Sequence, residues 1–93
     1  METLSSDQLA LAREMAMALV PHSEIAVAIG MDADLFAVEM NKPESDIYKS
    51  VNAGFLITKT KIQKSVIEMA QRGSSPAQAE ALRLIKQFNI SNA

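Results

Sequence analysis

The amino-acid sequence predicts an all-α protein: a helix-turn-helix unit of three short helices, then a long helix and a C-terminal helix that form an antiparallel hairpin. Two observations support this fold class. Apolar residues recur at three- and four-residue steps along the chain, which is the period of an amphipathic helix. Each run is bounded by serine, aspartate, proline or glycine at positions where these residues start or stop helices. We expect one domain over residues 1–43 and a second, an oligomerisation region, over residues 44–93.

The first helix is predicted over about residues 6–19. Ser5 and Gln8 have the spacing of a capping box, in which each side chain accepts a hydrogen bond from the backbone of the other. Pro21 closes the helix, because proline disfavours helical dihedrals in the residue before it. The residues expected on the buried side are Leu9, Ala12, Ala16 and Leu19.

The next segment has the spacing of a helix-turn-helix unit. Ala26 is small where two helices would cross, and Gly30 stands four residues later, where a turn needs the left-handed conformation. Met31 is expected beneath this turn, and Phe36 follows the glycine by six residues. The second helix is therefore predicted to be short and to bury Ile25, Ala26 and Ile29.

The third helix is predicted to begin at an Asp32 cap and to end at Lys42-Pro43. Its expected buried residues are Leu35, Phe36 and Met40. In a DNA-reading motif, the start of this helix carries side chains that bond phosphates and base edges. The corresponding residues here are Asp32, Ala33, Asp34, Ala37 and Val38. Two carboxylates repel phosphates, so we do not expect this helix to read a DNA groove.

The fourth helix is the longest, running from a Ser45 cap to Arg72, with Gly73 as its stop signal. Its apolar stripe is predicted to comprise Ile47, Val51, Phe55, Ile62, Val66, Met69 and Ala70. About 27 residues extend roughly 40 Å, so the helix must project from the body, bend, or pack on a neighbouring chain. Gly54 marks the place where a bend would cost least.

The fifth helix is predicted over about residues 76–88. Ser75 is expected at its cap, with Pro76 at the first helical position and Gln78 completing a capping box. The short link from Gly73 makes a hairpin with the fourth helix. The expected inner face comprises Ala77, Ala81, Leu84, Ile85 and Phe88, and residues 89–93 are expected to form a frayed tail.

Composition argues against an enzyme. The chain has no cysteine, which excludes thiolate zinc sites and cysteine nucleophiles, and His22 is its only histidine, so no serine triad can form. We expect His22 to be an exposed first-turn residue. Asp32, Asp34 and Glu39 suggest a magnesium site, but helix capping explains acids at a helix start more simply. No catalytic residue, cofactor or metal is predicted.

Targeting features are not evident in the sequence. The acidic start of the chain differs from the basic start of a signal peptide, and no apolar run approaches the length of a transmembrane helix. We therefore expect a cytoplasmic protein that does not bind membranes.

The charge is distributed unevenly along the chain. The net charge is −2, but residues 1–46 hold nine acids and two bases (−7), whereas residues 47–93 hold seven bases and two acids (+5). Such asymmetry indicates a polyanionic partner or self-association, although pairing of the two halves within one molecule would give the same pattern. The candidate DNA-binding residues are Lys49, Lys59, Lys61, Lys64 and Arg72 on the long helix. A solvated helix face is the competing interpretation of these cations.

Three segments together resemble a known family. They are Glu24-Ile25-Ala26 with Ile29-Gly30-Met31-Asp32, then Ile47-Tyr48-Lys49-Ser50-Val51-Asn52-Ala53-Gly54, and then Ser65-Val66-Ile67-Glu68-Met69-Ala70-Gln71-Arg72-Gly73 before the helix at Ala77 to Leu84. The chain resembles the small terminase subunits of tailed bacteriophages, over about residues 23–87. The resemblance implies a non-enzymatic DNA-packaging subunit that binds double-stranded DNA and assembles into a ring in the bacterial host cytoplasm.

The resemblance also implies a C-terminal segment that engages the large ATPase-nuclease subunit. Only about five residues follow Phe88 here, and the third helix is acidic, so both docking of the large subunit and DNA reading by the motif depart from the family pattern. Two alternatives stay open. The first is a helix-turn-helix transcriptional regulator, and the second is a small helical protein-protein interaction module that does not bind DNA.

Overall fold

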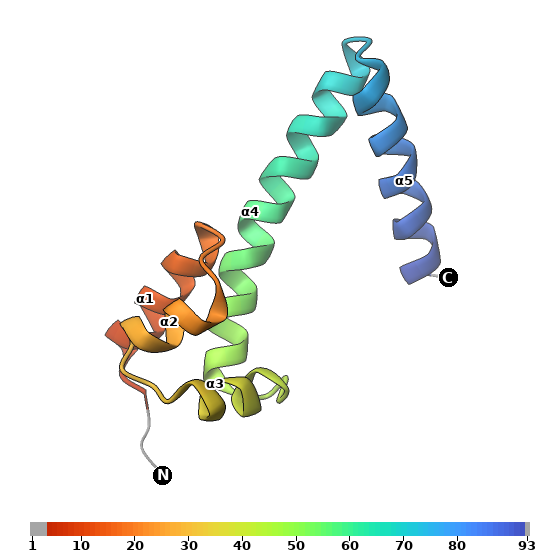
Figure 1. Ribbon diagram of the computed structural model, residues 1–93. Helices are drawn as coiled ribbons and strands as arrows, with labels where there is room; N and C mark the ends of the chain where they lie inside the picture. The colour runs from red at the N-terminus through yellow and green to blue at the C-terminus, as the bar shows by residue number, and fades with distance from the viewer. Residues whose placement is uncertain (1–3, 93) are drawn as a thin grey trace. The chain divides into compact units, whose positions relative to one another are not determined.

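The computed structural model describes residues 4–92, and within that range the protein has five α-helices and no strand (Figure 1). The helices are α1 (Ser6–Met17), α2 (His22–Ala28), α3 (Ala33–Met40), α4 (Asp46–Gln71) and α5 (Ser75–Ser91). The predicted all-α class is confirmed. Compact packing divides the chain into two units, with Thr58 the last residue of the first and Lys59 the first of the second. The domain boundary expected at residue 43 stays a prediction.

Helix α1 begins as predicted and ends earlier than predicted. The Ser5 hydroxyl accepts from the Gln8 amide at 3.1 Å, and the Gln8 side chain accepts from the Ser5 amide at 2.8 Å, which completes the capping box. The helix stops at Met17 because Leu19 adopts a left-handed conformation (φ 60°). The Leu19 side chain is exposed there, so its predicted burial is wrong.

The turn between α2 and α3 forms as the glycine predicts. Gly30 is left-handed (φ 73°), and the Met31 amide donates to the Ala26 carbonyl at 2.8 Å across the turn. One Asp32 carboxylate oxygen accepts from two amides at the start of α3, which confirms this cap. The Gln8 amide group also donates to the Ile29 carbonyl at 2.8 Å and so ties α1 to the end of α2.

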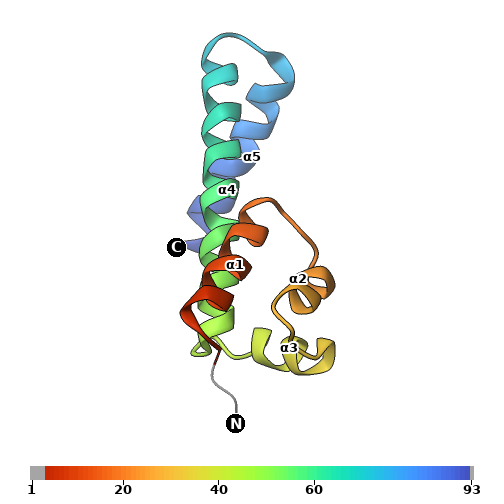
Figure 2. The ribbon, with the colours of Figure 1, turned by 90° about the vertical axis from the view of Figure 1, so that its left-hand side faces the viewer.

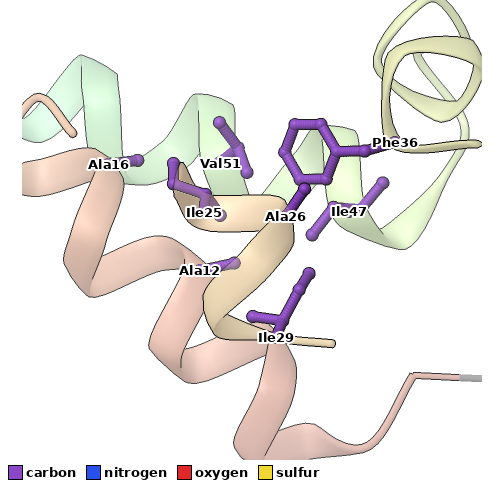
Figure 3. Close-up of a cluster of buried hydrophobic side chains, with 8 residues drawn as sticks. All are labelled: Ala12, Ala16, Ile25, Ala26, Ile29, Phe36, Ile47 and Val51. Atoms are coloured by element: carbon purple, nitrogen blue, oxygen red, sulfur yellow. The ribbon is translucent and has the colours of Figure 1, made fainter. Parts of the chain in front are cut away.

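The core lies in the first unit and draws side chains from four helices (Figure 3). Its buried members are Ala12, Ala16, Ile25, Ala26, Ile29, Phe36, Ile47 and Val51. Phe36 lies between α2 and α4 (Figure 3). The centroid of the His22 ring lies 5.6 Å from the centroid of the Phe36 ring. Leu35 is exposed, contrary to expectation, because α3 is only two turns long and turns Phe36 inward.

The start of α4 is fixed by Ser45. Its hydroxyl accepts from the Tyr48 amide at 3.1 Å and donates to the Glu39 carbonyl at 2.9 Å, which confirms the predicted cap. The helix continues without interruption through Gly54, which is buried against α1. A close approach of two helices, rather than a break in α4, explains the glycine. The Thr58 hydroxyl donates to the Met17 carbonyl and closes this contact.

The second unit contains the end of α4, a tight turn and α5, which turns back after the connection (Figure 2). Gly73 is left-handed (φ 99°), as a helix stop requires, and the Ser74 amide donates to the Met69 carbonyl. The cap of α5 is Ser74 rather than the predicted Ser75, because its hydroxyl accepts from the Ala77 amide.

Helix α5 is also longer than predicted. It continues to Ser91, so the expected frayed tail is helical over most of its length, and Ala93 lies outside the described residues. Ala77 is the one residue of α5 that is buried. Within residues 4–92, no helix combines the length and apolarity that crossing a bilayer requires.

Candidate functional site

The five predicted DNA-binding residues are all exposed. Lys49 belongs to the first unit, and the other four belong to the second. At 100° per residue, Lys61, Lys64 and Arg72 fall within about 80° around the helix axis. Lys59 lies about 160° from Lys61, on the side of α4 that faces α5. We call Lys61, Lys64 and Arg72 the basic face.

The cations of the basic face have no ion-pair partner within the described part of the chain. Lys61, Lys64 and Arg72 form no ion pair with any residue between 4 and 92. The ion pairs that the structure shows lie elsewhere, as Lys42 with Glu39 at 3.6 Å and Arg83 with Glu80. The basic face therefore presents three positive charges to an outside partner.

One carboxylate on the basic face was missed by sequence reasoning. Glu68 stands four residues after Lys64 and four before Arg72, so the same helical spacing places it on this face. It lowers the net charge of the face and repels a phosphate. The sequence signal that identifies it is its four-residue spacing from both Lys64 and Arg72.

Helix α5 carries an ion pair of its own. The Arg83 guanidinium donates two hydrogen bonds to the Glu80 carboxylate, and the pair is exposed. These hydrogen bonds, together with the charge of the partner, lower the pKa of Glu80 and raise the pKa of Arg83. Arg83 thus has a direct ion-pair partner, whereas Lys61, Lys64 and Arg72 have none among residues 4–92.

An open groove of about 900 Å³ lies between the end of α4 and α5, within the second unit. Its apolar lining includes Ile67 and Ala70 of α4 and Ala81, Leu84, Ile85 and Phe88 of α5. Glutamines from both helices also line it, and Lys59 is the single charged residue among the described residues of the lining. Ile85 and Phe88 are 57% and 67% exposed, so these two members of the predicted inner face of α5 are not covered, whereas Ala77 is buried. We call this feature the α4–α5 groove.

The outer side of α3 is acidic and apolar. Leu35 and Val38 are 48% and 50% exposed, and the exposed Asp34 stands beside them. Asp32, Ala33 and Ala37 are also exposed, so every position examined for groove reading is accessible, and none offers a cation. We call Asp34, Leu35 and Val38 the α3 ridge.

The remaining candidate chemistry is structural. Asp32 is engaged as a helix cap, and Glu39 pairs with Lys42. Within the described range, no three histidine, cysteine or acidic side chains come close enough together to hold a metal ion. His22 is the exposed first residue of α2, as expected, and its ring contacts Phe36.

No protein family, curated protein or solved structure matches this chain.

Proposed function

We propose that this protein is a non-enzymatic, DNA-binding subunit of a phage-type DNA-packaging complex and that it acts as an oligomer. The observation that carries the DNA-binding part is the basic face, which presents Lys61, Lys64 and Arg72 without ion partners among residues 4–92. Phosphate contacts by lysine and arginine supply most of the sequence-independent affinity for duplex DNA. Because the α3 ridge is acidic and carboxylates repel phosphates, we assign the DNA contact to α4 and not to α3.

The packaging assignment rests on the resemblance and on the order of elements. A helix-turn-helix unit over α2 and α3, followed by an α4–α5 hairpin that oligomerises, is the arrangement that the resemblance implies. The partners are then double-stranded DNA, further copies of the chain, and a large ATPase-nuclease subunit in the host cytoplasm. The exposed apolar residues of α5 support the oligomeric part, because a lone helix with an uncovered apolar side is marginal in water.

The test is binding to random-sequence duplex DNA, measured by fluorescence anisotropy over a range of salt concentrations. We expect binding at low salt that weakens as salt rises, since each neutralised phosphate releases counterions. Changing Lys61, Lys64 and Arg72 together to Gln should lower the slope of log K against log salt by roughly 3. The matched control changes Arg13, Lys42 and Lys86 to Gln, which removes the same charge away from the basic face.

The outcomes separate the functional classes. Binding that is lost with the basic face and kept in the control supports the proposal. Equal loss in both variants shows that only net charge matters and contradicts the assigned surface. No binding at low salt favours the protein-protein interaction module. Strong preference for one palindromic site, bound by a dimer, favours the transcriptional regulator.

A further inference from the structure

The α3 ridge is an exposed surface that no other segment of residues 4–92 covers. Asp32 fixes the start of α3 through two hydrogen bonds, and Phe36 anchors the helix in the core. Leu35 and Val38 are three residues apart, so they lie one above the other on a single side of the helix. Asp34 adds a negative charge beside them. Such a surface suits an apolar groove that contains a cation.

The α4–α5 groove has these properties. Its lining combines aliphatic and aromatic side chains with glutamines, and Lys59 is the one cation that the described residues contribute to it. Alanines at positions 70 and 81 leave room between the two helices for an incoming side chain. A groove of about 900 Å³ is of the size that proteins use to bind ligands and helices.

We propose that the α3 ridge of one copy docks into the α4–α5 groove of a second copy. The first argument is charge complementarity. Residues 1–58 carry nine acids and three bases (−6), and residues 59–93 carry six bases and two acids (+4). The unit that holds the α3 ridge is therefore acidic and the unit that holds the α4–α5 groove is basic, and the contact sets Asp34 of the ridge against Lys59 of the groove lining.

The second argument is shape. Two grooves facing each other would leave their concave surfaces unfilled and would bring Lys59 of both copies together. A two-turn helix such as α3 extends roughly 12 Å, whereas the α5 wall of the groove, Gln78 to Ser91, extends roughly 21 Å. The ridge therefore fits along the groove, with Leu35 and Val38 as its apolar anchors.

The contact is head-to-tail, because it joins different surfaces of the two copies. Each copy keeps one free ridge or groove after pairing, so the contact repeats into a ring or an open chain. The basic face lies on another side of α4 from the groove, which leaves it accessible to DNA. This inference rests on the oligomeric part of the proposed function and specifies its interface.

The test is a mixing experiment. One variant breaks the ridge (Leu35→Asp with Val38→Asp), and the other breaks the groove (Ile85→Asp with Phe88→Asp). All four side chains are exposed, so circular dichroism should show unchanged helix content in the first variant and a folded first unit in both. Size-exclusion chromatography with light scattering then reports the mass of the wild type, of each variant and of their equimolar mixture.

We expect the wild type to form concentration-dependent oligomers and each variant alone to be a monomer. The mixture should form a dimer and nothing larger, because it contains one intact ridge and one intact groove. A wild type that stays monomeric overturns the inference, as does a ridge variant that oligomerises like the wild type or a mixture that stays monomeric.

A charge exchange checks the register of the contact. Asp34→Lys and Lys59→Glu should each weaken association roughly two- to fivefold, the scale of an exposed ion pair, and the double variant should recover it. Lys86→Glu, which makes the same charge change outside the groove lining, is the matched control and should retain more association than Lys59→Glu. Equal effects of Lys59→Glu and Lys86→Glu would overturn the pairing.

DNA binding by the same samples separates this inference from the proposed function. A wild type that binds duplex DNA as a monomer contradicts the interface and leaves the DNA-binding proposal standing. If the wild type forms oligomers, each variant alone is a monomer and their mixture is a dimer, but none of these samples retains DNA, then the interface is supported and the DNA-binding proposal is contradicted.

Discussion

A side chain on Gly54 would collide with the main chain of Arg13. A Cβ atom built there lies 2.1 Å from the Arg13 carbonyl oxygen and 3.1 Å from the Ala16 Cβ. The first of these contacts is with backbone, which cannot rotate away. The two helices α1 and α4 therefore meet as closely as they do only because position 54 has no side chain.

Gly54→Ala is accordingly expected to destabilise the first unit, although alanine is the better helix former. The clash should cost about 1–3 kcal/mol of unfolding free energy, the range for overpacked cores. Urea unfolding followed by circular dichroism measures this. Ser65→Ala, at an exposed position of the same helix, is the control and should be neutral or slightly stabilising. Gly54→Ala with wild-type stability would contradict the close approach.

Gln8 is expected to stabilise the fold through two separable roles. Its side-chain oxygen accepts from Ser5, and its amide nitrogen donates to the Ile29 carbonyl. Gln8→Glu keeps the acceptor and removes the donor, so we expect a loss of about 1 kcal/mol with the capping box retained. Chemical denaturation of Gln8→Glu and Ser5→Ala compares the two roles, since the second removes the cap and leaves the donor. A Gln8→Glu variant as stable as the wild type would show that the bond to Ile29 contributes nothing.

Glu68→Gln is expected to strengthen DNA binding. The carboxylate lies on the basic face beside Lys64 and Arg72, where it repels phosphate. Removing the charge should raise affinity a few-fold at low salt and little at high salt, because salt screens exposed charges. Anisotropy titrations measure both conditions. Glu80→Gln, which changes the same type of residue on α5, should have a smaller effect, and equal gains would show that the location of the charge is unimportant.

The Glu80–Arg83 pair gives α5 a predicted dependence on pH. Hydrogen bonds from Arg83 hold the pKa of Glu80 below its ordinary value in the folded state. The carboxylate therefore stabilises α5 fully above its unfolded pKa, and this contribution is lost as the pH falls through the folded pKa. Titration of the Glu80 side chain by NMR should show the lowered pKa, and Arg83→Gln should return it to the ordinary range. An unchanged pKa in that variant would contradict the pairing.

The sequence predicted a helix boundary correctly where one residue type determines the backbone conformation or caps the helix end. Ser5 with Gln8, Gly30 and Asp32 were assigned from sequence, and each makes the expected hydrogen bond or adopts the expected dihedral angle. The end of α1 was missed because a leucine, Leu19, occupies the left-handed position that glycine usually fills.

Burial was harder to predict, because periodicity shows that a side chain is apolar and not which neighbour covers it. Leu35 and Phe88 have the spacing of core residues and are exposed, since no other part of the described chain covers either of them. The candidate site shows the same limit. Helical periodicity placed the cations around α4 and separates Lys59 from Lys61, but recognising that Lys59 lines a groove required knowing on which side of α4 the helix α5 lies.

The burial of Ala77 alone in α5 makes this helix a local reporter of association. Amides in the first unit are held by a packed core, whereas those of α5 beyond its first turn depend on a helix with little covered apolar surface. In the monomer, the α5 amides should exchange their hydrogens quickly. In the oligomer, their exchange rate should fall, because binding of a second copy stabilises the closed, protected state of the helix. The deuterium uptake of this seventeen-residue helix then measures the protein concentration at which the monomer associates.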